Sequence, residues 1–284
     1  MTTQAHVVVP VDGSMAAKRA LGYAARLADR LSARLSFAHV QAPLGSIVEL
    51  KATDAEGEAM LASVAANYPD ADSTTAKIIV GTDVACAIYA AFPEAILVVG
   101  SDHAARRASG AKQSIAEVLV REAHHHPILV VGPRAEAESL DGPIAIALDG
   151  SKVAEDALLA ALTWTRFFAA SLQLVQVVST QVAPNDAEQP PRDYLESVQV
   201  HLMVGGVASE CYIVVDDDPV AGLVQHLREH RCSLVVMSTH ARRGVEREAL
   251  GSVTMGVIAA SPCAVCAVHP VHSRSAGTSC RVTV

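Results

Sequence analysis

The sequence predicts an α/β protein built from two doubly wound, five-stranded parallel-sheet domains in tandem. Three observations support this fold class. Short apolar runs alternate with amphipathic helical stretches, the same order of elements occurs twice, and 51% of the residues are hydrophobic, enough for two buried cores. A chain of 284 residues is long enough for two domains of ordinary size.

The elements of the first copy follow in a regular order. Residues 6–11, "HVVVPV", form a continuous apolar run, as expected of a strand buried on both faces. Ser14 is placed to cap a helix whose apolar stripe runs from Ala17 to Leu31. The remaining predicted elements are a strand at 34–40, a helical stretch, a strand at 76–81, a helix at 83–91, a strand at 95–100, a helix at 113–124 and a strand at 127–132. Right-handed crossovers between such strands give a parallel sheet covered on both faces, with ligands expected at the carboxyl ends of the strands.

The second copy repeats this pattern at an offset of 137 to 138 residues. Three pairs carry the register: Asp12 with Asp149, Ser14 with Ser151, and Ser114 with Ser252. A register held over so long a stretch indicates duplication. We place the domains at residues 1–133 and 142–270, joined by a polar stretch between two Gly-Pro pairs, and expect residues 271–284 to be a disordered tail.

Composition and charge exclude several classes of function. A net charge of -8 and an aromatic content of 4% argue against nucleic-acid binding. The apolar runs are too short to span a bilayer, and "MTTQAHVVVPVDGS" lacks the basic start of a signal peptide, so we expect a cytoplasmic protein without a membrane partner. Six scattered cysteines do not form a disulfide framework, and Cys263 and Cys266 are expected to stay reduced because residues three apart on a strand face opposite sides.

No catalytic or metal-binding set is visible. The sequence has no nucleophile elbow and no Walker-type Gly-Lys-Ser/Thr, and the "HHH" at 124–126 is best explained as a solvated helix end. A receiver domain of a response regulator shares the fold but needs an acidic pair and a lysine that the sequence does not offer. We therefore expect neither an enzyme nor a metal site.

Two blocks in each copy resemble universal stress protein domains. "VPVDGS" and "IALDGS" are similar to the first strand and turn of that family, whose nucleotide signature is G-x2-G-x9-G-[ST]. "STHARRGVEREALGS" followed by "SPCAVCAV" is similar to the signature and the last strand, and "GSDHAARRASGAKQS" followed by "HHHPILVV" is a looser version. The resemblance implies a tandem universal stress protein with the adenine nucleotide alpha hydrolase-like fold, ATP or ADP as ligand together with Mg²⁺, and pairing that extends in some members to a homodimer.

The resemblance also implies which residues contact the nucleotide. In the second copy they are Asp149, Val177, Met237, Ser238, Ala241, Gly251, Ser252 and Val253; in the first they are Asp12, Val40, Gly100 and Ser114. Glycines at the signature positions let backbone N–H groups approach phosphate oxygens at a helix N-terminus. The ends of the second strands, His39-Val40 and Gln176-Val177, resemble the wall beside the adenine.

The two copies depart from the signature to different degrees. The second replaces two glycines by the small residues Ser238 and Ala241, whereas the first carries the bulkier His103 and Gln113. We therefore expect the second copy to be the better nucleotide site. Two alternatives stay open: Asp-Gly-Ser is also ordinary turn chemistry, and the whole chain could be a ligand-free scaffold for dimerisation and partner binding. A slow ATPase is a weaker alternative, since no general base can be named.

Overall fold

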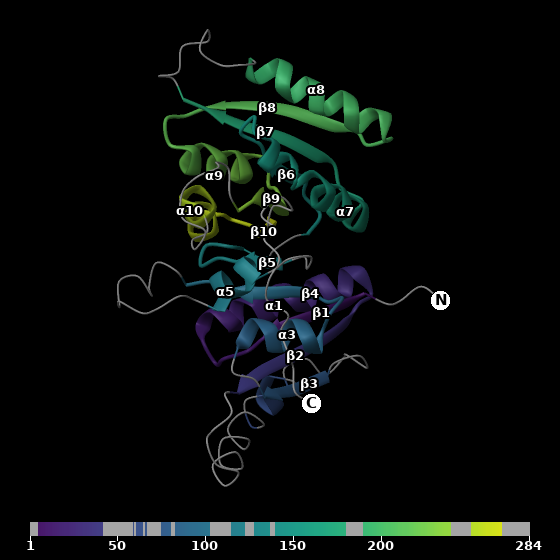
Figure 1. Cartoon of the computed structure of the whole chain (residues 1–284), viewed down its shortest axis with the longest axis vertical. Helices are drawn as coiled ribbons and strands as arrows, with labels where there is room; N and C mark the ends of the chain where they lie inside the picture. Colours follow the sequence, from purple (N-terminus) through teal and green to yellow (C-terminus); the bar gives the residue numbers. More distant parts are fainter. Residues whose placement is uncertain are drawn as a thin grey trace. The chain divides into compact units, whose positions relative to one another are not determined.

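The computed structural model describes residues 5–41, 59, 61–64, 66, 75–80, 83–102, 115–122, 128–136, 140–179, 190–239 and 251–268. Contacts divide the chain into two compact units, one ending at Val131 and the next beginning at Gly132. In both units parallel strands alternate with helices, which confirms the predicted fold class (Figure 1). The expected tail at 271–284 lies outside the described residues.

The first unit contains a five-stranded parallel sheet in the order β3-β2-β1-β4-β5. Its elements are β1 (His6–Pro10), α1 (Met15–Leu31), β2 (Arg34–Gln41), β3 (Thr75–Val80), α3 (Val84–Ala91), β4 (Ile96–Gly100), α5 (Ile115–Glu122) and β5 (Ile128–Val131). The described side chains of β1, β4 and β5 are almost wholly buried, as their continuous apolar sequences predict.

The second unit repeats the topology, with strand order β8-β7-β6-β9-β10. Its elements are β6 (Ile144–Ala147), α6 (Lys152–Glu155), α7 (Leu158–Phe168), β7 (Leu172–Val178), α8 (Pro191–Val204), β8 (Ser209–Val215), α9 (Pro219–Glu229), β9 (Leu234–Ser238), α10 (Ser252–Ala260) and β10 (Ala264–Val268). α9 packs beside α10, and α7 and α8 pack on β6, β7 and β8 (Figure 1). Right-handed crossovers place these two pairs of helices on opposite faces of the sheet.

The helix after the first strand differs between the units. α1 runs unbroken for 17 residues, whereas its counterpart is divided into α6 and α7 by a turn at Asp156 and Ala157. In unit 1 this helix lies so close to the end of β4 that a Cβ on Gly100 would stand 1.9 Å from the carbonyl oxygen of Ala16. Unit 2 has Ser238 at the position of Gly100, and the helix of unit 2 is divided after its first turn.

Candidate functional site

Those predicted site residues that the structure describes lie at the carboxyl edge of the sheet in each unit. In unit 2 Asp149 comes two residues after the end of β6, and Val177 is the residue before the last of β7. Met237 and Ser238 are the last two residues of β9. β6 lies between β7 and β9 and pairs in parallel with both, which brings the three strand ends to the same edge. In unit 1 Asp12, Val40 and Gly100 occupy the equivalent places at the ends of β1, β2 and β4.

Both aspartates form the same turn. The Oδ1 atom of Asp12 accepts a hydrogen bond of 3.0 Å from the Ser14 N–H, and Asp149 Oδ1 accepts one of 3.0 Å from the Ser151 N–H. The glycine between the aspartate and the serine has a φ of 76° at Gly13 and of 85° at Gly150. This is a left-handed conformation, which a residue with a Cβ adopts only with strain. Turn chemistry therefore accounts for Asp-Gly-Ser in both units, and nucleotide contact by these carboxylates remains a prediction.

The start of α10 in unit 2 lies at the same edge. The Gly251 N–H donates to the Thr239 carbonyl at 2.9 Å, and a Cβ at Gly251 would also stand 2.9 Å from that oxygen. Glycine is thus required here by close backbone packing, whether or not a phosphate binds. Ser252 and Val253 follow at the exposed first turn of the helix.

The N-terminus of α10 has no side-chain cap. Four other helices have one: α1 is capped by Ser14, α3 by Asp83, α6 by Ser151 and α9 by Asp218. α7 follows α6 after a turn at Asp156 and Ala157, α8 begins after Pro190, and neither of these two helices has a side-chain cap. Because the first N–H groups of any helix lack partners within it, the start of α10 offers donors and a positive dipole end to an anion.

At the equivalent edge of unit 1 two of the described charged residues form an ion pair. Arg19, on α1, forms an ion pair with Asp102 and also donates to the Ser101 carbonyl at 3.4 Å. Asp102 comes two residues after Gly100, which ends β4. The counterpart of Arg19 in unit 2 is Asp156, so the two edges carry different charges.

Four predicted positions lie outside the described residues: His103, Gln113, Ser114 and Ala241. The roles given to Ala241 and Ser114 therefore stay predictions. Gly100 is brought to the predicted edge, but its contact with α1 explains the glycine by packing alone.

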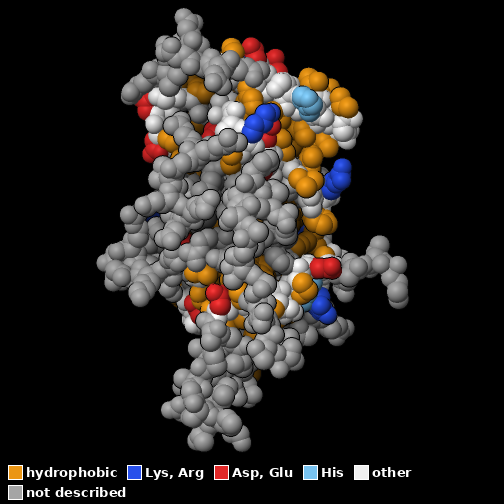
Figure 2. Space-filling view, viewed as in Figure 1, with side chains coloured by type: hydrophobic (Ala, Val, Ile, Leu, Met, Phe, Trp, Pro, Cys, Tyr) orange, Lys and Arg blue, Asp and Glu red, His pale blue; other side chains and the backbone are white. Residues whose placement is uncertain are grey.

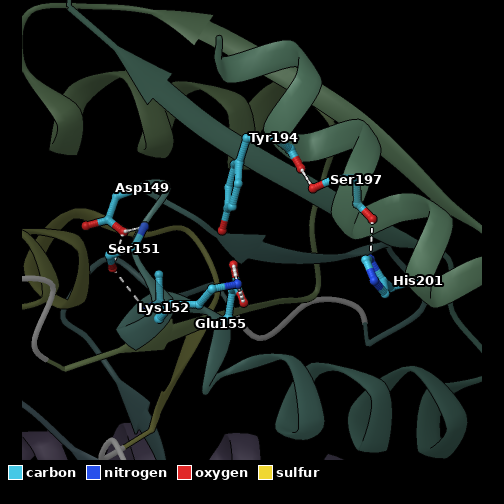
Figure 3. A network of polar contacts seen from close by, with 8 residues as sticks. Asp149, Ser151, Lys152, Glu155, Tyr194, Ser197 and His201 are labelled. Atoms are coloured by element: carbon cyan, nitrogen blue, oxygen red, sulfur yellow. Dashed lines mark hydrogen bonds and ion pairs between the residues drawn. The ribbon is translucent and has the colours of Figure 1, made fainter. Parts of the chain in front are cut away.

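Two residues that were not predicted from the sequence, Tyr194 and Glu155, lie beside the edge of the unit 2 sheet. Tyr194, in the first turn of α8, points its hydroxyl toward Glu155 on α6 and the Asp149 turn (Figure 3). Burial, and then the negative charges of Glu155 and Asp149, raise the pKa of the Tyr194 hydroxyl above its usual value. Spacing along the sequence gave no signal for this group, because Tyr194 comes from a helix that follows a different strand.

The cysteines and histidines behave as core or surface residues. Cys263 and Cys266 are free thiols with different neighbours: Cys263 contacts Ser261, and the Cys266 sulfur accepts a hydrogen bond of 3.3 Å from Trp164. Among the described residues, no three His, Cys, Asp or Glu side chains are grouped to hold a metal ion, and no helix is both long and apolar enough to cross a membrane. The "HHH" segment lies outside the described part of the chain.

The fold is a tandem, doubly wound α/β arrangement in which the ends of parallel strands meet at one edge of the sheet in each unit. The sequence model of the universal stress protein family matches residues 5–132 and 142–269, so the chain belongs to that family. The two matches confirm the tandem arrangement that the resemblance implied.

Solved structures agree with this assignment. A universal stress protein from Archaeoglobus fulgidus DSM 4304 has 19% identity and a TM-score of 0.68, with 93% of this chain and 98% of that chain covered. A putative universal stress protein from Pseudomonas aeruginosa UCBPP-PA14 has 13% identity and a TM-score of 0.54, with 95% of each chain covered. At such identities these likenesses establish the fold. No curated protein sequence matches the chain significantly.

Proposed function

We propose that unit 2 binds an adenine nucleotide, ATP or ADP with Mg²⁺, at the carboxyl edge of its sheet. In this proposal the protein is a cytoplasmic, non-enzymatic regulator of a stress response, and nucleotide occupancy alters the edge that other molecules contact. The observation that carries the proposal is the uncapped start of α10 at Gly251 and Ser252, in the sequence block that resembles the nucleotide signature of the family.

The described residues fit the phosphate end of such a ligand. N–H groups at a helix start bind anions through hydrogen bonds and the helix dipole. Ser252 is exposed and its hydroxyl caps nothing within α10, so it is available to a phosphate oxygen. Gly251 keeps this turn close to the Thr239 backbone, which holds the first N–H groups of α10 at the edge.

The same edge also fits a hydrated Mg²⁺. This ion usually keeps several waters and binds through one or two carboxylates together with substrate phosphates, so it needs no protein cage. Asp149 is exposed, and both of its hydrogen bonds, from the N–H and the hydroxyl of Ser151, go to Oδ1. Asp149 Oδ2 thus makes no hydrogen bond with the described residues and would hold such an ion through water.

Ser252→Ala tests the proposal by removing one hydroxyl without adding bulk. Hydrogen bonds to charged groups contribute about 1.5 to 3 kcal/mol, so we expect MgATP to bind this variant at least about tenfold more weakly in isothermal titration. Ser114→Ala changes the counterpart of Ser252 in the first copy and serves as the matched control. Equal affinity of wild type and Ser252→Ala, or loss only in Ser114→Ala, would contradict a phosphate site at α10.

A second candidate is a partner-binding scaffold, favoured by the exposed apolar surface of α8. Val200, Met203 and Val204 are 57%, 63% and 86% exposed, and apolar side chains are visible around this helix (Figure 2). A second copy of the chain is the occupant we test first. Light scattering should then show a dimer that Val204→Glu converts to a monomer; a wild-type monomer at all concentrations would exclude this homodimer.

A further inference from the structure

The outward sides of α7 and α8 in unit 2 carry large apolar side chains that are exposed to solvent. Both helices pack on the same side of the sheet, and hydrophobic side chains are visible over both of them (Figure 2). Leu159 and Phe167 on α7 are 75% and 47% exposed. We call these two residues, together with the exposed Val200, Met203 and Val204 of α8, the α7–α8 surface.

The duplicated helix of unit 1 shows that the fold does not require apolar residues on this outward side. At an offset of 137 to 138 residues, Leu159 corresponds to Gly22 and Phe167 to Arg30 in α1. The sides of α1 and α7 that pack on their sheets are apolar in both units, as burial requires. In the described part of unit 1, Met15 is the one large apolar side chain with comparable exposure. The α7–α8 surface is therefore a property of unit 2, and its exposure indicates an interaction site.

The size of the α7–α8 surface matches one side of a protein dimer interface. Its side chains expose on the order of 500 Å² of apolar surface, which is at the upper end of what an ordinary monomer leaves open. A standard interface buries about 800 Å² on each partner, and roughly 60% of this area is apolar. The α7–α8 surface thus supplies the apolar share of one partner in such an interface.

The charges around the α7–α8 surface favour a second copy of the chain as its occupant. With histidine neutral, the charged side chains of the two helices are Arg166 on α7 and, on α8, Arg192, Asp193 and Glu196, all of them exposed. Two cations and two carboxylates give no net charge, so an anionic lipid surface or a nucleic acid is not attracted. A second copy presents the same four residues, and a symmetric pairing can set the cations of one copy against the carboxylates of the other.

We propose that two copies of the chain associate through their α7–α8 surfaces in a symmetric, closed dimer. This inference rests on the partner-binding scaffold, the second candidate function, and it adds the side chains of α7 and the limit of two copies. A symmetric pair uses the same surface on both copies, so the contact leaves no free surface for a third copy. The described part of unit 1 offers no second surface of this kind, because glycine and arginine occupy the positions of Leu159 and Phe167.

Leu159→Glu tests the inference because it places a charge on α7 where the proposed dimer buries a leucine. The side chain is exposed in the single chain, so the variant should fold normally, and the fluorescence of the buried Trp164 checks this. Gly22→Glu changes the counterpart position in unit 1, where no atom lies within 4 Å of a Cβ, and is the matched control. In sedimentation equilibrium, wild type and Gly22→Glu should form dimers and nothing larger. The dimer Kd of Leu159→Glu should rise at least about a hundredfold, because a buried charge loses its hydration.

The outcomes separate this inference from dimerisation through α8 alone. If Leu159→Glu dimerises as wild type does while Val204→Glu is a monomer, the inference fails and the α8 contact stands. A wild-type chain that stays monomeric at all concentrations overturns both. Wild-type species larger than a dimer overturn the closed arrangement. Equal weakening of the dimer by Gly22→Glu also contradicts the inference, because association would then not depend on the surface of unit 2.

Discussion

Gly100→Ala should destabilise unit 1 strongly in the absence of any ligand. The new Cβ would stand 1.9 Å from the Ala16 carbonyl oxygen and 2.2 Å from its carbonyl carbon, both backbone atoms of α1. Because backbone cannot rotate away as a side chain can, either the helix or the strand end must move. Overpacking of this kind costs about 1 to 3 kcal/mol, occasionally more, and contact with backbone places Gly100→Ala at about 3 kcal/mol.

The matched control is Gly22→Ala in the middle of α1. No atom lies within 4 Å of a Cβ at Gly22, so alanine should stabilise the helix by about 0.5 to 1 kcal/mol. Thermal unfolding followed by circular dichroism should show a midpoint about 10 °C lower for Gly100→Ala and a few degrees higher for Gly22→Ala. A Gly100→Ala protein as stable as wild type would refute the packing explanation.

Two further predictions concern buried titratable groups of unit 2. Burial, and then the neighbouring His230, lower the pKa of His226 to about 4 from 6.5, so its stabilisation is complete above pH 6.5 and is lost as the pH falls toward 4. Urea unfolding should show that the free energy of unfolding falls by up to about 3 kcal/mol between pH 6.5 and pH 4. This dependence on pH should be weaker in His226→Gln and unchanged in the exposed His201→Gln. A wild-type free energy of unfolding that does not change with pH would contradict this. Burial also raises the pKa of Cys263 to about 11 and that of Cys266 to about 12, so neither should react with iodoacetamide before the half-exposed Cys86. Mass spectrometry of the native protein would contradict this by showing early alkylation of either thiol or a bridge between them.

The fold was predictable because its signals are local and repeated. Continuous apolar runs such as "HVVVPV" become strands buried on both faces, and Ser14 and Ser151 cap the helices that follow. The parallel order of the strands follows from these alternating elements and the handedness of crossovers. Family matches over residues 5–132 and 142–269 confirm the tandem arrangement.

The site was predictable only in part, because its remaining features depend on distances between elements. The need for glycine at position 100 becomes visible only when α1 lies against β4. Tyr194 reaches the edge from a helix about forty residues beyond Asp149, and no spacing rule connects the two. The division of the α1 counterpart into α6 and α7 likewise has no signal in the local sequence.

Binding of ATP to unit 2 can be measured most directly through Trp164, the single tryptophan of the chain, which is buried in that unit at 1% exposure. Its fluorescence reports the unfolding of unit 2 with and without MgATP. For a Kd near 10 μM, about 1 mM MgATP should stabilise the unit by about 2.7 kcal/mol, and Ser252→Ala should lose a large part of this gain while Ser114→Ala keeps it. An unchanged Trp164 transition at saturating MgATP would contradict a nucleotide site in unit 2 and leave the partner-binding scaffold as the function to pursue.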